Sequence, residues 1–185
     1  FHLFTHAFFK ALLFLGSGSV IHAFKDEQNI NNMGGVWKKL PYTYALMIIG
    51  TLALTGFPFL SGFYSKDAII EFAYLKGNTT GYYAAGIGIF TAFLTSIYSW
   101  RLIFKTFHGE YNNKEINIEE THESPLVMLV PLVVLSIGSI FAGFLFKYLF
   151  IGHGGESYFW AESIKFLEPL SSDHPPTWFL FLTPS

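Results

Sequence analysis

Four long apolar stretches, separated by short polar segments, constrain this chain more than any other feature of its sequence. They cover about residues 2–24, 42–75, 82–107 and 126–150. A helix needs about 20 apolar residues to cross a bilayer, and lipid offers no partner for the unpaired backbone of a lone strand. The pattern therefore predicts an all-α fold, a polytopic transmembrane helix bundle with about four spans in this chain.

The composition agrees with a membrane environment. Hydrophobic residues make up 51% of the chain and charged residues only 13%, about half of the 25% usual for a soluble domain. The net charge of −2 gives no indication of a nucleic-acid partner. The chain contains no cysteine, which excludes disulfides and thiolate metal sites within it. The expected surroundings are therefore the lipid bilayer.

The polar segments suggest how the chain is organised. We interpret residues 1–150 as part of one membrane module, and residues 151–185 as an extramembrane or interfacial segment leading into a further span. Residues 152–173 mix aromatic and charged side chains, which is typical of a short amphipathic helix on a membrane surface. Because residue 1 already lies inside an apolar stretch, we interpret the sequence as part of a longer protein.

Three ionisable residues share one face of the first predicted span. His2, His6 and Lys10 recur every four residues, so they drift by about 40° per step and cover about 12 Å of helix axis. Histidine titrates near neutral pH, and a buried lysine can be brought to exchange protons. The row therefore predicts a proton relay. The alternative is that the histidines are interfacial and Lys10 extends its ammonium to water.

The second stretch contains a helix breaker in its middle. Gly56 to Gly62 reads GFPFLSG, in which the proline removes a backbone donor and the glycines loosen the backbone. Broken helices at membrane depth line protein or water-filled cavities and often mark transport sites. Lys66 and Asp67 follow the break directly, which predicts a second site there. The alternative is that the span ends near Ser65 and these charges are interfacial.

The same residues carry a family resemblance that extends over essentially the whole chain. Residues 5–22, THAFFKALLFLGSGSVIH, resemble the signature helix of the antiporter-like subunits of respiratory complex I. Residues 54–67, LTGFPFLSGFYSKD, look like the broken helix of the same family. The stretches 98–101, YSWR, and 122–125, HESP, fit the family as well.

The resemblance implies a function and a place for each site residue. His2, His6 and Lys10 match the family's central axis on the intact helix, Lys66 matches the lysine of the outlet half-channel, and Asp67 matches the motif beside it. The chain itself would carry no cofactor; NADH, FMN, iron–sulfur clusters and quinone would be bound by other subunits. The implied partners are other membrane-arm subunits of complex I, especially the neighbouring antiporter-like subunit.

Two alternatives stay open at the level of sequence. One is the large subunit of a multi-subunit Na⁺/H⁺ antiporter, whose helices are closely related. The other is a structural scaffold subunit, in which buried charges only lock helices together. For the location we expect the bacterial inner (plasma) membrane, because of the polar loop over residues 111–123, with the mitochondrial inner membrane as the alternative.

Overall fold

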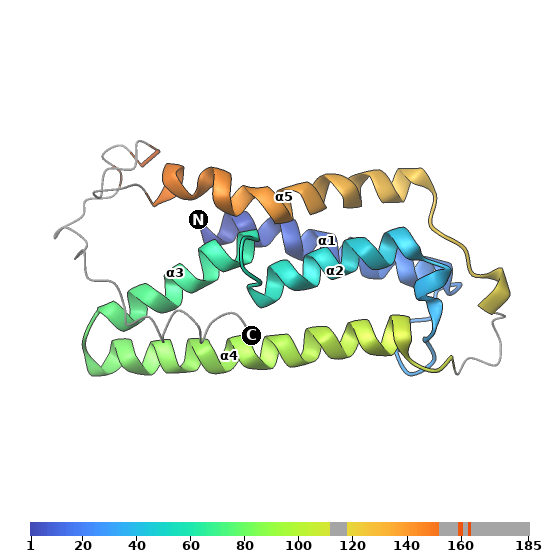
Figure 1. Ribbon diagram of the computed structural model, residues 1–185, viewed down its shortest axis with the longest axis horizontal. Helices are drawn as coiled ribbons and strands as arrows, with labels where there is room; N and C mark the ends of the chain where they lie inside the picture. The colour runs from blue at the N-terminus through green and yellow to red at the C-terminus, as the bar shows by residue number, and fades with distance from the viewer. Residues whose placement is uncertain (112–117, 152–158, 161–162, 164–185) are drawn as a thin grey trace.

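The computed structural model describes the fold of residues 1–111, 118–151, 159, 160 and 163. These residues form a bundle of helices along one long axis (Figure 1) and contain no strand, which confirms the all-α prediction. The five α-helices are α1 (His2–Ala23), α2 (Pro41–Thr55), α3 (Ser61–Leu75), α4 (Thr79–Ile103) and α5 (Leu126–Phe150). Shorter helical segments are the 3₁₀ helices η1 (Val36–Lys38) and η3 (Ile118–Glu120) and the π-helix η2 (Phe104–His108). The helix predicted over residues 152–173 lies almost wholly outside the described residues, and the division near residue 150 stays a prediction.

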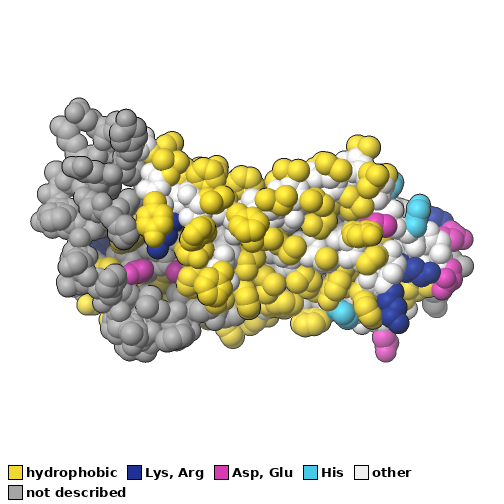
Figure 2. All heavy atoms as spheres, turned by 45° about the horizontal axis from the view of Figure 1, so that its top comes forward, with side chains coloured by type: hydrophobic (Ala, Val, Ile, Leu, Met, Phe, Trp, Pro, Cys, Tyr) yellow, Lys and Arg dark blue, Asp and Glu magenta, His cyan; other side chains and the backbone are white. Residues whose placement is uncertain are grey.

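The helices have the lengths and apolar character that a membrane requires. Among the described residues, α1, α5 and the continuous stretch Thr79–His108 are long and apolar enough to cross a bilayer, and α2 is a shorter apolar helix. Aliphatic and aromatic side chains cover the middle of the visible face, and charged ones gather toward its ends (Figure 2). The chain is therefore a polytopic helical membrane fragment, as predicted.

The second predicted span is formed by two helices. Each of α2 and α3 has 15 residues, which corresponds to about 22 Å at 1.5 Å per residue. Neither half alone covers the roughly 30 Å of hydrocarbon, whereas the two together do. The break occupies residues 56–60, and Gly62 lies inside the first turn of α3 rather than in the break.

The broken helix lies in the middle layer of the bundle. In Figure 1, α1 and α5 lie on one side of α2 and α3, and α4 lies on the other side. Small residues bring the layers together: a Cβ added to Gly143 of α5 would come within 2.5 Å of the Ser61 Cα. The Ser61 hydroxyl donates to the Gly138 carbonyl of α5 at 2.9 Å. This close docking fixes where α3 begins.

Polar contacts hold the opposite end of the bundle, where α1 ends and α2 and α5 begin. The Glu123 carboxylate accepts from the Tyr42 and Thr43 amides at 2.9 and 3.3 Å and so caps α2. The Thr43 hydroxyl lies 3.0 Å from Ser19, which in turn lies 2.6 Å from Ser124. These buried hydroxyls tie the ends of three helices into one polar cluster.

Candidate functional site

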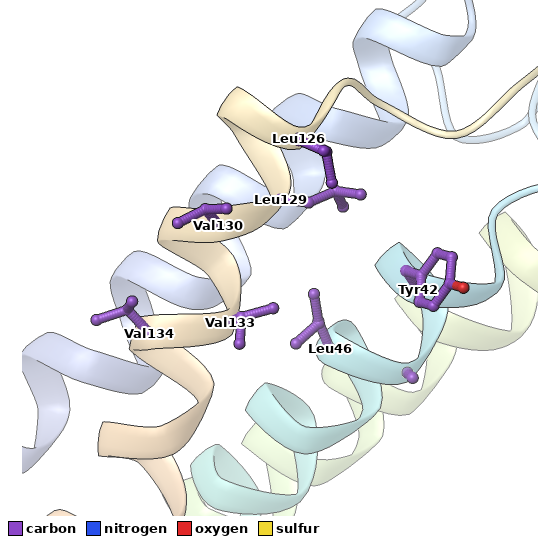
Figure 3. A pocket seen from close by; sticks show the side chains of 8 residues that line it. Tyr42, Leu46, Leu126, Leu129, Val130, Val133 and Val134 are labelled. Carbon is purple, nitrogen blue, oxygen red and sulfur yellow. The ribbon is translucent and has the colours of Figure 1, made fainter.

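A groove and a cavity in the bundle differ sharply in their chemistry. The groove, of about 470 Å³, opens between the first halves of α2 and α5 (Figure 3). Its lining is apolar apart from one tyrosine: Tyr42, Ala45, Leu46, Leu126, Leu129, Val130, Val133 and Val134. No lysine, histidine or carboxylate is among these residues, so the groove is not a place where protons are exchanged on ionisable side chains.

The cavity, of about 210 Å³, lies between α1, α3, α4 and the end of α2, and several ionisable side chains line it. Its lining residues are His2, His6, Phe9, Lys10, Leu54, Gly62, Lys66, Thr95 and Tyr98. Four of the five residues singled out from the sequence thus face one space: three from α1 and one from α3. The described residues that line it do not include Asp67.

The α1 side of the cavity is built by helical periodicity. The rings of His2 and His6 have centroids 5.5 Å apart, and the next aromatic ring, Phe9, lies 5.2 Å from His6 with its edge toward it. Phe9 is fully buried and packs with Ala53 and Leu54 of α2. The buried, apolar Phe9 side chain therefore packs beside the His2 and His6 rings on the α1 side of the cavity.

The α3 side is positioned by the way α2 ends. Gly56 adopts a left-handed conformation with φ of 87°, which glycine reaches without a Cβ penalty. The Phe57 amide then donates to the Leu52 carbonyl at 2.9 Å, the six-to-one bond of a Schellman-type helix end. Pro58 follows two residues after the cap, where it prevents the helix from continuing.

The broken helix gives Lys66 a specific partner. The last carbonyls of a helix have no intrahelical donor and carry the negative end of its dipole. The Lys66 ammonium, from the second turn of α3, donates to the Thr55 carbonyl at the end of α2 at 2.8 Å. The cation therefore lies at the break, as the motif predicted, between the carbonyl and the cavity.

Two hydroxyls that sequence reasoning did not single out connect the two sides. The Ser65 hydroxyl lies 2.9 Å from Nδ1 of His2 and accepts from the Thr5 hydroxyl at 2.7 Å. Both Ser65 and Thr5 are buried. The available signal was weak: Ser65 lies four residues after Ser61, on one face of α3, and directly before Lys66.

Comparison with known proteins assigns the family. The model of a family described as "NADH:quinone oxidoreductase/Mrp antiporter, TM" matches residues 1–95. The chain belongs to this family. A second model, "NADH dehydrogenase subunit 5 C-terminus", matches residues 98–155. All five candidate residues lie within the part matched by the NADH:quinone oxidoreductase/Mrp antiporter model.

Individual relatives of this family extend the match over most of the chain. NADH-ubiquinone oxidoreductase chain 5 of Marchantia polymorpha is 51% identical over 167 residues, which is 90% of this chain and 25% of that protein. Chain 5 of Phytophthora infestans is 47% identical over 187 residues, 98% of this chain and 28% of that protein. NADH-quinone oxidoreductase subunit L of Rhodobacter capsulatus is 50% identical over 170 residues, 86% and 24% respectively. The chain spans about a quarter of the length of these relatives.

Proposed function

We propose that this chain forms part of a proton-translocating membrane subunit of NADH:quinone oxidoreductase, complex I. The observation that carries the proposal is the single cavity that joins three ionisable residues of α1 to Lys66 of α3. Ionisable side chains within membrane helices are costly, and they usually face a bundle interior or water and mark ion or proton pathways. Broken helices at membrane depth mark the same kind of site.

The residues have complementary roles in this proposal. His2 and His6 accept and release protons at their ring nitrogens, which can each act as donor or acceptor. Lys10 and Lys66 carry protons as ammonium groups that line the same cavity. Lys66 lies at the break and passes protons toward one side of the membrane. Asp67 remains a less central candidate, because the cavity lining lacks it.

Partners and cofactors follow from the same proposal. The relatives are named as chain 5 or subunit L of an oxidoreductase, so other membrane-arm subunits, especially a neighbouring antiporter-like one, are the proposed partners. NADH, FMN, iron–sulfur clusters and quinone are assigned to other subunits. A bacterial and a plant relative match at 50% and 51% identity, so identity favours neither the bacterial plasma membrane nor the mitochondrial inner membrane.

The two alternatives are less well supported. A cation/proton antiporter subunit accounts for the match over residues 1–95, but the match of residues 98–155 to a subunit 5 C-terminus favours complex I. A scaffold role accounts for the Lys66–Thr55 hydrogen bond alone. It does not account for the histidines and the second lysine around the same cavity.

The decisive experiment replaces Lys66 by methionine in the full-length subunit within the assembled complex. NADH-driven proton uptake into inverted membrane vesicles is measured together with NADH oxidation and a native-gel test of assembly. We expect an assembled complex with pumping reduced at least tenfold. Lys76→Met is the matched control, because Lys76 is an exposed lysine at the end of the same helix, and it should pump normally.

Two outcomes contradict the proposal. An assembled Lys66→Met complex that pumps as well as wild type removes Lys66 from the proton route. Loss of assembly in both Lys66→Met and Lys66→Gln, with normal assembly of Lys76→Met, favours the scaffold alternative.

A further inference from the structure

The hydroxyl of Ser65 has three close polar neighbours, and a fourth in the Gly62 carbonyl oxygen at 3.5 Å, but only one proton. It lies 2.9 Å from Nδ1 of His2, 2.7 Å from the Thr5 hydroxyl and 3.0 Å from the Ser61 carbonyl oxygen. A serine hydroxyl donates one hydrogen bond and accepts two. The carbonyl can only accept, so the three contacts are satisfied together in one way: Ser65 donates to Ser61 and accepts from both Thr5 and His2.

The Thr5 hydroxyl also lies 3.1 Å from the His2 carbonyl oxygen, so two hydroxyl protons are shared among four contacts. With a proton on Nδ1 of His2, three of the four contacts hold a proton; without it, at most two do. If Ser65 donated its proton to Nδ1 of His2, no proton would lie between its oxygen and the Ser61 carbonyl at 3.0 Å. If Ser65 donated to Thr5, the same gap would remain. Buried polar atoms that face each other without a proton are costly because water cannot replace the missing bond. Ser65 is 1% exposed and Thr5 is fully buried, so this cost applies here.

His2 is also one of the residues that line the cavity. Among the described residues, Nε2 of His2 has no hydrogen-bond partner and is not one of the fully buried polar atoms that lack one. The cavity also holds the Lys66 and Lys10 side chains. Ammonium groups are donors only, so they favour a free lone pair over a second N–H on an imidazole that lines the same cavity.

We infer that the Ser65 hydroxyl holds neutral His2 in the Nδ1–H tautomer, so that protons enter and leave this imidazole through Nε2. Ser65 is thus a positioning residue: it fixes the ring through the nitrogen that does not exchange protons, as partners of the second nitrogen do for histidines at other sites. Thr5 supports Ser65 by donating to it. The functional consequence rests on the proposed relay, whereas the tautomer itself does not.

The direct test is the infrared spectrum of histidine, whose ring bands differ between the two tautomers. The His2 signal is isolated as the difference between the assembled wild-type complex and His2→Gln, both with ¹³C-labelled histidine. We expect the Nδ1–H bands in wild type. In Ser65→Ala, measured against the double variant with His2→Gln, the ratio of the Nδ1–H to the Nε2–H tautomer should fall by roughly fivefold, the Boltzmann factor of one typical hydrogen bond. Nε2–H bands in the wild type overturn the inference, as does an unchanged tautomer in Ser65→Ala.

Pumping measurements separate this inference from the proposed function. Ser65→Ala should lower proton uptake per NADH oxidised, while assembly and NADH oxidation persist. Thr5→Val should also lower proton uptake, whereas Thr5→Ser, which keeps the hydroxyl, should pump as well as wild type. Ser136→Ala is the matched control, because this buried serine donates only to the Val133 carbonyl of its own helix. If Lys66→Met abolishes pumping but Ser65→Ala pumps normally, only the role of Ser65 is overturned. Normal pumping by Lys66→Met contradicts the proposed proton relay. The tautomer of His2 is then tested by the infrared spectrum alone. If Ser65→Ala does not assemble, the wild-type spectrum decides.

Discussion

The ammonium nitrogen of Lys66 lies 2.8 Å from the carbonyl oxygen of Thr55, so a lysine of α3 caps the C-terminal end of α2 across the break. The contact has two consequences. It satisfies one carbonyl that the end of α2 leaves unpaired, and it holds the lysine beside the cavity. A neutral amine still has two protons to donate, so the contact to Thr55 survives the release of a proton from Lys66.

Lys66→Arg separates the charge of this lysine from its ability to release a proton. Arginine keeps the positive charge and can reach the Thr55 carbonyl, but it does not deprotonate in proteins. We expect normal assembly with proton pumping reduced at least tenfold, measured in inverted vesicles as NADH-driven proton uptake per NADH oxidised. Wild-type pumping by the assembled arginine variant would show that Lys66 contributes only its charge.

Gly62→Ala tests the close approach of the two half-helices. A Cβ at this position would lie 1.7 Å from the Ala53 carbonyl oxygen, which is backbone and cannot rotate away. The half-helices must separate, which costs about 1 to 3 kcal/mol or more for overpacking. We expect a lower thermal unfolding temperature of the full-length subunit in detergent and weaker assembly.

The control for that variant is Gly86→Ala in α4. Nothing lies within 4 Å of a Cβ at this glycine, which is exposed. Alanine is favoured over glycine inside a helix by about 1 kcal/mol, so this variant should be as stable as wild type or slightly more so. Equal unfolding temperatures for Gly62→Ala and wild type would contradict the tight contact.

Parts of this architecture depend only on local rules, and these were predictable from sequence. The last span was expected over residues 126–150, and α5 runs from Leu126 to Phe150, because apolar length sets a membrane helix. The common face of His2, His6 and Lys10 follows from helical period alone. The break was located through its proline, although Gly62 proved to serve close packing rather than to loosen the backbone.

Other parts depend on how distant segments dock. Lys66 shares a cavity with the α1 histidines because α3 docks closely on the bundle through Ser61 and Gly143, and no spacing rule joins positions so far apart. Ser65 and Thr5 were missed for a different reason. Hydroxyls in helices commonly bond to their own backbone, as those of Ser17 and Thr95 do here, so a serine that also contacts another helix has no distinctive pattern.

Glu123→Ala tests the cap that holds the start of α2. The carboxylate accepts from the amides of Tyr42 and Thr43, and removal of an N-cap acceptor typically costs about 1 kcal/mol. Hydrogen exchange of these two amides, followed by mass spectrometry on the full-length protein, should accelerate by roughly fivefold. Glu123→Gln, which keeps an acceptor oxygen, should show a smaller effect, and Glu110→Ala, at an exposed position, should show none. Unchanged exchange in Glu123→Ala would contradict the cap.

The ion pairs at the polar end of the bundle predict how its stability depends on pH and salt. Glu119 accepts from Lys39 at 2.7 Å and Glu120 from Lys25 at 2.6 Å, and these hydrogen bonds and charges hold the pKa of both carboxyls below their ordinary value of 4.5. A carboxyl whose pKa is lowered in the folded state contributes its full stabilisation at any pH above its pKa in the unfolded state. This contribution is lost as the pH falls through the pKa of the folded state. The unfolding temperature of wild type should therefore exceed that of the double variant Glu119→Gln, Glu120→Gln modestly at pH 7, and the difference should shrink as the pH falls below 4.5 and through the folded pKa. Because both pairs are exposed, added salt at pH 7 should shrink the same difference. A difference that changed neither with falling pH nor with added salt would show that the two carboxylates act through something other than these ion pairs.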